Sequence, residues 1–211
     1  MSVETLSQAA YRRLRDDIIM GRIAPNTILS ERSLAERLDI SRTPLRSALS
    51  MLEREQVIER MSNGAVLVRQ VSVEQLLDIF QLRQILESAA AGRAAEHGIT
   101  PDLLAVRARQ ETYLQDTQSD FESFWKDDDD FHYAVSVAAR FSLLPKLLAE
   151  QRAIVRRSTV IHSDTTFTDQ AREHIEVIDA ITARNPQEAR AAMARHFDQM
   201  RMRTLNSLNR D

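Results

Sequence analysis

One aspartate and three histidines have the residue types and spacing of metal ligands. The stretch WKDDDDFHYAV places Asp128 four residues before His132, so the two side chains share one face of a helix. His174 and His196 each lie among apolar residues at helical spacing, which predicts that they face a bundle interior. Three imidazoles and a carboxylate that converge between helices suit Zn, Ni, Mn or Fe, with open positions for water or a ligand oxygen.

The aspartate run also has a simpler interpretation, as an acidic helix start stabilised by the helix dipole. An isolated Asp–His pair would favour that interpretation, whereas the addition of His174 and His196 favours a metal site. The spacing makes Asp128 the coordinating carboxylate. Of the remaining histidines, His97 is predicted to cap a helix end and His162 to lie at the surface. The other carboxylates of the run are predicted to be solvated: Asp127, Asp129 and Asp130.

The composition favours a helical protein without disulfides. The chain of 211 residues has 4 Gly and 5 Pro, is rich in strong helix formers, and has no Cys that could form a disulfide or a thiolate site. Its start lacks the apolar core of a signal peptide, and no apolar stretch is long enough to span a membrane. We therefore expect a cytoplasmic protein that does not associate with membranes.

Residues 1–71 have the pattern of a winged helix-turn-helix domain. Helical stripes occupy residues 9–21, 31–40 and 42–56, and Ser30 and Ser41 are suitable N-caps for the second and third helices. Short strands are predicted on either side of the Ser-Asn-Gly turn, because Asn and Gly both tolerate positive φ. The segment between the first two helices is expected to be an extended connector.

This region resembles the N-terminal domain of the GntR family of bacterial transcription regulators. The resemblance rests on the sequence SERSLAERLDISRTPLRSALSMLE and on the Asn-Gly turn. The start of a recognition helix reaches base edges in the major groove, where Arg pairs with guanine, while Ser and Thr hold phosphates. A surface helix with solvated arginines is the less favoured alternative. The resemblance and this chemistry predict these contacts to double-stranded operator DNA: Arg32, Ser41, Arg42, Thr43, Arg46, Asn63 and Gly64.

Residues 72–211 are predicted to form a separate all-α domain of six or seven helices. The sequence predicts helices at about 119–139, 142–162 and 168–184. Thr100-Pro101 and Asn185-Pro186 each combine an N-cap residue with a proline at the first helical position. The whole chain is therefore predicted to be mainly α, with a small β-hairpin wing.

The spacing of the proposed ligands resembles the metal pattern of the FCD effector-binding domain, in which Asp-x-x-x-His is followed by two distant histidines. The pattern falls on Asp128, His132, His174 and His196. The resemblance implies a small organic-acid effector, and Arg83 matches the arginine expected to bind its carboxylate. A structural salt bridge between Arg83 and Glu87 is an equally favoured interpretation. Arg152 and Arg156 are weaker candidates for effector binding.

Together these patterns predict a ligand-responsive repressor that binds a pseudo-palindromic operator as a homodimer. The alternative is a metal-dependent hydrolase fused to a DNA-binding domain, since an open metal site can activate water. A hydrolase also needs a general base near the metal. The sequence contains no His-Glu-x-x-His or similar motif, and it therefore favours a regulator over an enzyme.

Overall fold

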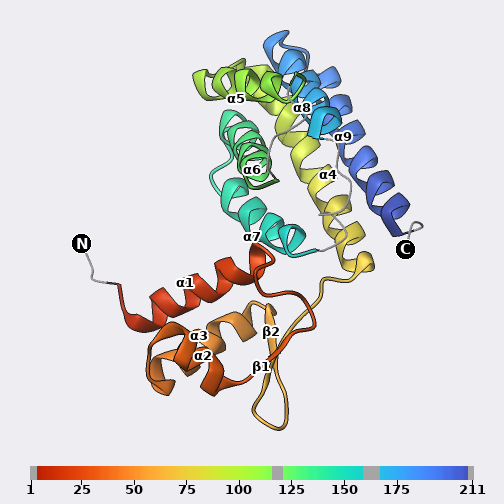
Figure 1. Cartoon of the computed structure of the whole chain (residues 1–211). Helices are drawn as coiled ribbons and strands as arrows, with labels where there is room; N and C mark the ends of the chain where they lie inside the picture. Colours follow the sequence, from red (N-terminus) through yellow and green to blue (C-terminus); the bar gives the residue numbers. More distant parts are fainter. Residues whose placement is uncertain (1–3, 116–120, 159–166, 209–211) are drawn as a thin grey trace. The chain divides into compact units, whose positions relative to one another are not determined.

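The computed structural model describes residues 4–115, 121–158 and 167–208 of the chain. It divides the chain into two compact units whose main division falls between Ser72 and Val73, with the described residues from Arg156 to Ser158 grouped with the first unit. Figure 1 shows that the first unit combines short helices with strands, whereas the second contains helices alone in its described part. The predicted fold class, mainly α with a small antiparallel sheet, is confirmed.

The first unit has three helices and a three-stranded sheet. The helices are α1 (Leu6–Ile19), α2 (Glu31–Leu38) and α3 (Arg42–Arg54). The strands are β1 (Ile28–Leu29), β2 (Ile58–Arg60) and β3 (Val66–Val68), in the antiparallel order β1-β3-β2. The hairpin β2–β3 was predicted, but β1 was not, because two residues are too few to show an alternating pattern. The expected connector therefore supplies an edge strand.

The core of this unit explains the position of α3. Its apolar face, Leu45, Leu49 and Leu52, is at most 1% exposed and packs with side chains of α1, α2 and the sheet. Burial of this face against three neighbours leaves the opposite face of α3 exposed. The polar start of the helix is thereby directed to solvent.

Two tight turns shape the surface of the first unit. Asp39 ends α2 in the left-handed region at φ 53°, which makes the turn into α3 short. At the wing tip only Gly64 has positive φ, at 80°, while the side chain of Asn63 accepts a hydrogen bond from the Ala65 N–H at 3.0 Å. Of the two turn residues that tolerate positive φ, only glycine is therefore required by its backbone conformation.

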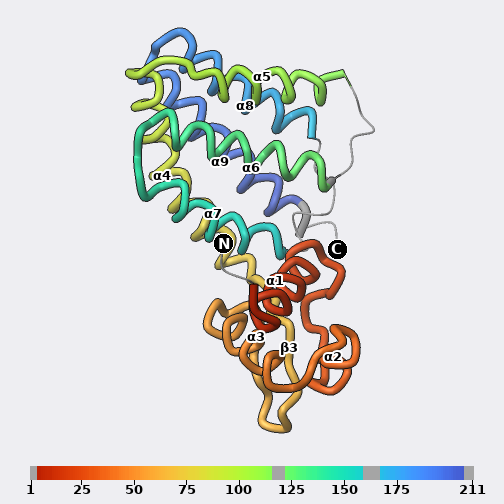
Figure 2. The backbone as a smooth tube through the Cα atoms, turned by 90° about the vertical axis from the view of Figure 1, so that its left-hand side faces the viewer, coloured from red at the N-terminus to blue at the C-terminus, as the bar shows by residue number. Residues whose placement is uncertain are grey.

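The second unit is a helical bundle around a long first helix. Figure 2 shows its helices running beside one another. The helix α4 packs against α6, α8 and α9, and α5 packs against α6 and α8. The bounds are α4 (Val73–His97), α5 (Pro101–Thr112), α6 (Phe121–Ala138), α7 (Leu144–Arg156), α8 (Phe167–Thr182) and α9 (Pro186–Leu208).

The predicted helix starts at Thr100 and Asn185 are confirmed. The Thr100 side chain accepts a hydrogen bond from Leu103 N–H at 3.3 Å, and Asn185 accepts one from Glu188 N–H at 3.1 Å. His97 is the last residue of α4, while His162 lies outside the described residues. Across the described ranges, none of the helices has the length and apolarity needed to cross a bilayer.

Ser30 and Ser41 both occupy N-cap positions, but their side chains differ in what they do. Ser30 Oγ accepts a hydrogen bond from Ser33 N–H at 3.0 Å at the start of α2. Ser41 precedes α3 without a side-chain capping bond, so its predicted capping role is wrong in that respect. Its hydroxyl is exposed at the start of the recognition helix.

This difference gives a stability test. Ser30→Ala should lower the free energy of unfolding by about 1 kcal/mol, since an N-cap bond is lost. Ser41→Ala serves as the matched control and should change it by well under about 0.5 kcal/mol, as at surface sites that lack such a bond. Urea denaturation of both variants measures the difference, and equal losses would contradict the assignment of a single capping serine.

Candidate metal centre and DNA-binding surface

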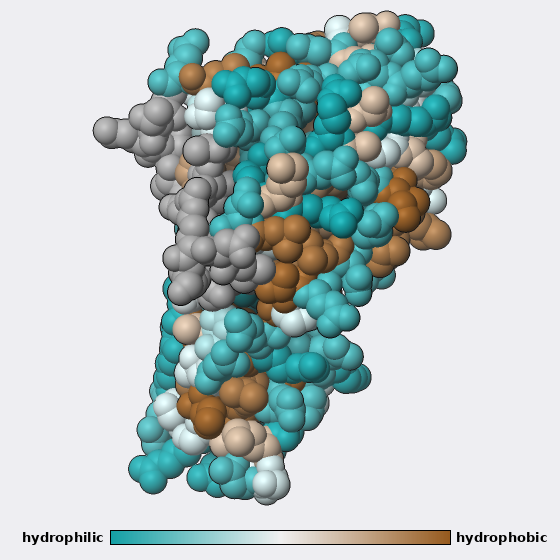
Figure 3. All heavy atoms as spheres, turned by 90° about the vertical axis from the view of Figure 1, so that its right-hand side faces the viewer, coloured by the Kyte–Doolittle hydropathy of each residue, from teal (hydrophilic) through white to brown (hydrophobic). Residues whose placement is uncertain are grey.

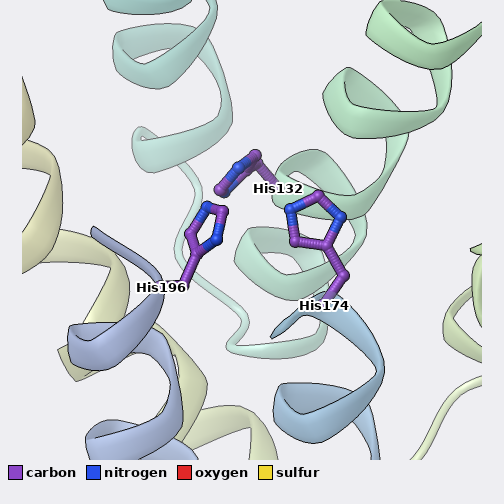
Figure 4. A group of neighbouring side chains, drawn as sticks. All are labelled: His132, His174 and His196. Atoms are coloured by element: carbon purple, nitrogen blue, oxygen red, sulfur yellow. The ribbon is translucent and has the colours of Figure 1, made fainter. Parts of the chain in front are cut away.

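Four predicted ligands meet inside the second unit. Figure 4 shows the rings of His132, His174 and His196, from α6, α8 and α9, turned towards one another. One ring nitrogen from each lies within 4.8 Å of the others. Asp128 Oδ1 lies 3.4 Å from His174 Nε2 and 3.8 Å from His132 Nε2. All four residues are at most 2% exposed, so water does not screen this cluster.

The inward-facing atoms of this cluster have no hydrogen-bond partner. They are Asp128 Oδ1 and the Nε2 atoms of all three histidines. A buried polar atom without a partner costs about 1–3 kcal/mol, so four at one point need a common explanation. A cation that accepts four electron pairs satisfies all of them. The observation supports a metal over the simpler interpretation of the run as a solvated helix start.

The outer nitrogens of the rings set the tautomers. His132 Nδ1 contacts Glu87 Oε2, His196 Nδ1 lies 2.8 Å from Glu173 Oε2, and His174 Nδ1 lies 3.3 Å from an amide oxygen. Carboxylate and amide oxygens accept hydrogen bonds, so each Nδ1 carries the proton. Each Nε2 therefore presents a lone pair to the centre. Metal-binding histidines are commonly oriented in this way.

The protonation states also fit coordination. Burial lowers the pKa of His174 to about 3 and lowers the pKa of His132 well below its usual value, so both rings are neutral near pH 7. Burial alone would raise the pKa of Asp128, but the charge and hydrogen bond of Arg152, together with His132 and His174, hold the pKa below its usual range. A cation would meet a carboxylate and the neutral imidazoles of His132 and His174, without competition from protons at these two rings.

The separations are close to those of a coordinated ion. Two atoms that each lie about 2.1 Å from a metal are at most about 4.2 Å apart. Donors at right angles are about 3 Å apart, so the imidazole nitrogens, which lie within 4.8 Å of one another, would have to approach one another by up to about 2 Å. Four protein ligands leave further positions for an effector or water in a five- or six-coordinate ion. The residues present thus fit a divalent metal.

The other aspartates of the run are ion-paired, and Asp129 and Asp130 are also partly solvated, with side chains 38% and 46% exposed, whereas Asp127 is 16% exposed. Asp127 and Asp130 both accept hydrogen bonds from Arg109, and Asp127 also accepts one from the Tyr113 hydroxyl at 2.8 Å. Asp129 pairs with Arg152. The run connects α6 to α5 and α7 through these ion pairs and also contains one candidate ligand, Asp128. Sequence spacing could not show this, because the partners are on other helices.

Two buried arginines flank the metal-ligand cluster. Arg83 Nε donates to Glu87 Oε1 at 2.7 Å, so the predicted structural salt bridge exists. Its Nη2 atom is nevertheless buried without a partner. Arg152 Nη2 donates to Asp128 Oδ2 at 2.5 Å, and its Nη1 atom also has no partner. The sequence could not show the contact between Arg152 and Asp128, because it depends on how α7 packs against α6.

The predicted DNA contacts are all exposed residues of the first unit. Every one of them is exposed, and four lie within two residues of the start of α3 or in its first turns. Arg46 pairs with Glu31 at 2.9 Å through Nε, and Arg32 pairs with Glu36 at 2.9 Å. Exposed pairs of this kind contribute about 0–1 kcal/mol and can be exchanged for phosphate or base contacts.

Glu31 and Arg60 form ion pairs that the sequence did not predict. These pairs fix the arrangement of α2, α3 and the sheet. Arg60, at the end of β2, donates to Glu31 at 3.0 Å and to the backbone oxygen of Arg46 at 3.1 Å. The bonds join α2, α3 and the sheet around the base of Arg46. An arginine at the end of a short strand carries no such signal in sequence, because its partners are 29 and 14 residues away.

A winged helix-turn-helix joined to a helical domain with a buried polar centre defines a DNA-binding regulator with a separate sensory domain. Residues 6–68 match the family described as bacterial regulatory proteins, gntR family, and residues 78–199 match the FCD domain. The chain therefore belongs to the GntR family of transcription regulators. Members of this family bind DNA and are not enzymes, which removes the hydrolase alternative.

Individual relatives agree with this assignment. The chain is 27% identical to the HTH-type transcriptional repressor RspR of Escherichia coli (strain K12), over 95% of this chain and 92% of RspR. It is 28% identical to the Uxu operon regulator of Haemophilus influenzae, over 96% of this chain and 84% of that regulator. The fold matches E. coli McbR/YncC with a TM-score of 0.75 at 21% identity, over 94% of this chain and 96% of that one.

The metal site can be tested with a matched pair from the aspartate run. We expect purified protein to carry about one divalent metal per chain by elemental analysis. Asp128→Asn should reduce this content strongly, because it removes the charged ligand. Asp130→Asn, which alters an exposed carboxylate two residues away, should leave it unchanged. Equal metal content in the two variants would contradict coordination by Asp128.

Proposed function

We propose that this protein is a metal-containing, effector-responsive repressor that acts in the cytoplasm and binds operator DNA as a homodimer. The observation that carries the proposal is the convergence of four buried, partnerless ligand atoms in the domain that follows the winged helix. A constitutive DNA-binding protein has no need of such a centre. The repressor role follows the description of RspR, and Zn, Ni and Mn are the candidate metals.

The metal would be held by Asp128, His132, His174 and His196. When bound, it would supply an electrophilic position for an oxygen of a small organic-acid effector. Arg83 would provide a further charged contact, because its Nη2 atom is buried and has no protein partner. Its salt bridge to Glu87 would fix the guanidinium for that contact, so the structural and effector-binding roles are compatible.

A direct chain of contacts joins the metal centre to α4. His132 Nδ1 binds Glu87, and Glu87 lies on the helix that begins at Val73, immediately after the first unit. An effector changes DNA affinity only if it binds the DNA-competent and DNA-incompetent dimers unequally. We propose that α4 transmits the effect of the effector to the DNA-binding unit, since it contains both Glu87 and Arg83 and is continuous with that unit.

On DNA, the start of α3 would enter the major groove, with Arg42 and Arg46 reading guanine. Ser41 and Thr43 would contact phosphates, as would Arg32 from α2. The wing would approach the backbone at Asn63-Gly64, where the Gly64 Cα faces open space. The exposure of all these residues supports this arrangement.

The DNA-binding mode can be tested by alanine variants. Arg42→Ala and Arg46→Ala should each cost about 1–3 kcal/mol of specific binding and relax base preference. Arg32→Ala should weaken binding to all sequences and reduce the salt dependence. Arg172→Ala, an exposed arginine of α8 paired with Asp169, is the control and should bind normally. Fluorescence anisotropy at several salt concentrations measures these effects, and unchanged operator affinity in both α3 variants would refute the assignment.

An apolar hollow between α4 and α7 supports the homodimer. It has a volume of about 400 Å³ and its lining includes Ile85, Leu143 and Leu147. These side chains are 60%, 80% and 42% exposed, which is unusual for clustered large hydrophobic residues in a monomer. Figure 3 shows one face of the molecule, which is mostly hydrophilic with separate hydrophobic patches. A second copy is the occupant that paired operator half-sites require.

The dimer can be tested by charge insertion. Leu143→Glu combined with Leu147→Glu should shift the protein from dimer to monomer, because two buried carboxylates per chain would oppose association. Leu104→Glu, at an equally exposed leucine on α5, should remain dimeric. Light scattering at micromolar concentration distinguishes these outcomes. A double variant that stays dimeric would exclude this face as the interface.

A further inference from the structure

The exposed face of α4 has an apolar centre between two unlike charges. Leu82, Ile85 and Ala89 form the centre, and the first two are 54% and 60% exposed. Asp78 lies one turn before this centre and Arg93 one turn after it, and both are exposed. The five residues follow one another at intervals of three or four, so they share one side of the helix. The apolar centre is continuous with the hollow between α4 and α7, because Ile85 and Ala89 belong to both.

The two charges of this face have no ion partner among the described residues. Neither Asp78 nor Arg93 forms a salt bridge there, whereas Glu96 of the same helix pairs with Arg190 at 3.7 Å. The guanidinium carbon of Arg93 instead lies 4.6 Å from the centroid of the Phe141 ring, and Phe141 lines the hollow. Asp78 and Arg93 can therefore pair with a partner that presents the opposite charges at the same spacing.

A second copy of α4 that runs in the opposite direction is such a partner. Asp78 and Arg93 are equally far along the helix from the point midway between Ile85 and Leu86. With a two-fold axis through that point, Asp78 of each chain would face Arg93 of the partner subunit. An interface of this kind repeats each contact, so the pair would form twice in every dimer. Parallel helices in register would instead place like charges together, which opposes association.

The same register explains the hollow beside this face. Leu82 and Ala89 are also equally far from the midpoint, so Leu82 would face Ala89 of the partner subunit. Ala89 lines the hollow of about 400 Å³, together with the exposed Leu143 and Leu147. A large side chain would therefore meet a small one beside an apolar depression, as interdigitating helix surfaces do at axial separations of about 8–10 Å.

We propose that two copies of this chain associate through antiparallel α4 helices, with Asp78 paired to Arg93 of the partner subunit and Leu82 inserted into the partner's hollow. The inference rests on the homodimer proposed above and specifies its register. The apolar centre would supply the affinity of the contact. The charges at its two ends would fix the direction and register of the helices, because a shifted or parallel arrangement would separate them or bring like charges together.

Charge reversal in the full-length protein tests the register. Asp78→Arg and Arg93→Asp should each weaken the dimer at least about tenfold, since each variant places two like-charge pairs in the interface. Asp102→Arg, at an exposed acid of α5, is the control and should dimerise like the wild type. Analytical ultracentrifugation over a range of concentrations measures the dissociation constants. Circular dichroism checks that each variant retains its helices, as expected for changes at exposed positions.

Mixing the two variants distinguishes this register from a general effect of charge. The Asp78→Arg chain has only positive charges at the two positions, and the Arg93→Asp chain has only negative ones. The mixture should therefore form heterodimers with about the affinity of the wild-type dimer, which native mass spectrometry resolves by mass. Failure of the mixture to recover that affinity would overturn the proposal. A monomeric wild type would refute the proposed homodimer itself, whereas a wild-type dimer with unaffected variants would refute only this inference.

Discussion

The polar contacts of the second unit are arranged around four buried candidate ligand atoms that have no hydrogen-bond partner. Such burial is unfavourable, and the bundle must recover the cost through contacts around the cluster. The ring of Phe131 stacks on His174 at 3.9 Å, and the outer nitrogens of the histidines are held by oxygens of α4, α5 and α8. These contacts fix the rings before any cation arrives. Side chains held in place in this way would lose little entropy on coordination of a metal.

Contacts extend from this point to every helix of the described bundle. His132 connects through Glu87 to α4, and Asp128 connects through Arg152 to α7. His174 is held from α5, and the partner of His196 on α8 is in turn held by Arg203 of α9. A change in the contacts of Asp128 and the three histidines would therefore affect all six helices of the described bundle. Networks of this kind transmit a local change because packed interiors have few alternative arrangements.

The first unit uses charge for a different purpose. Glu31 pairs with both Arg46 and Arg60, and these pairs are partly exposed. Exposed ion pairs add little stability, so the apolar face of α3 supplies the energy and the ion pairs set the direction of the side chains. This division suits a surface that must exchange its carboxylate partners for phosphates. The ion pairs of the second unit, by contrast, are buried, so their partners cannot be replaced by water.

The sequence by itself determined the two-domain order, the helices and the four candidate ligands. These features depend on local periodicity, on capping residues such as Thr100 and Asn185, and on the i, i+4 spacing of Asp128 and His132. The tertiary structure decided which polar groups meet: the pairing of β1 with β3, and the contacts of Arg60 and Arg152. The physical reason is distance along the chain. Partners that lie 14 to 45 residues apart leave no periodic trace, because their contact is set by how helices and strands pack.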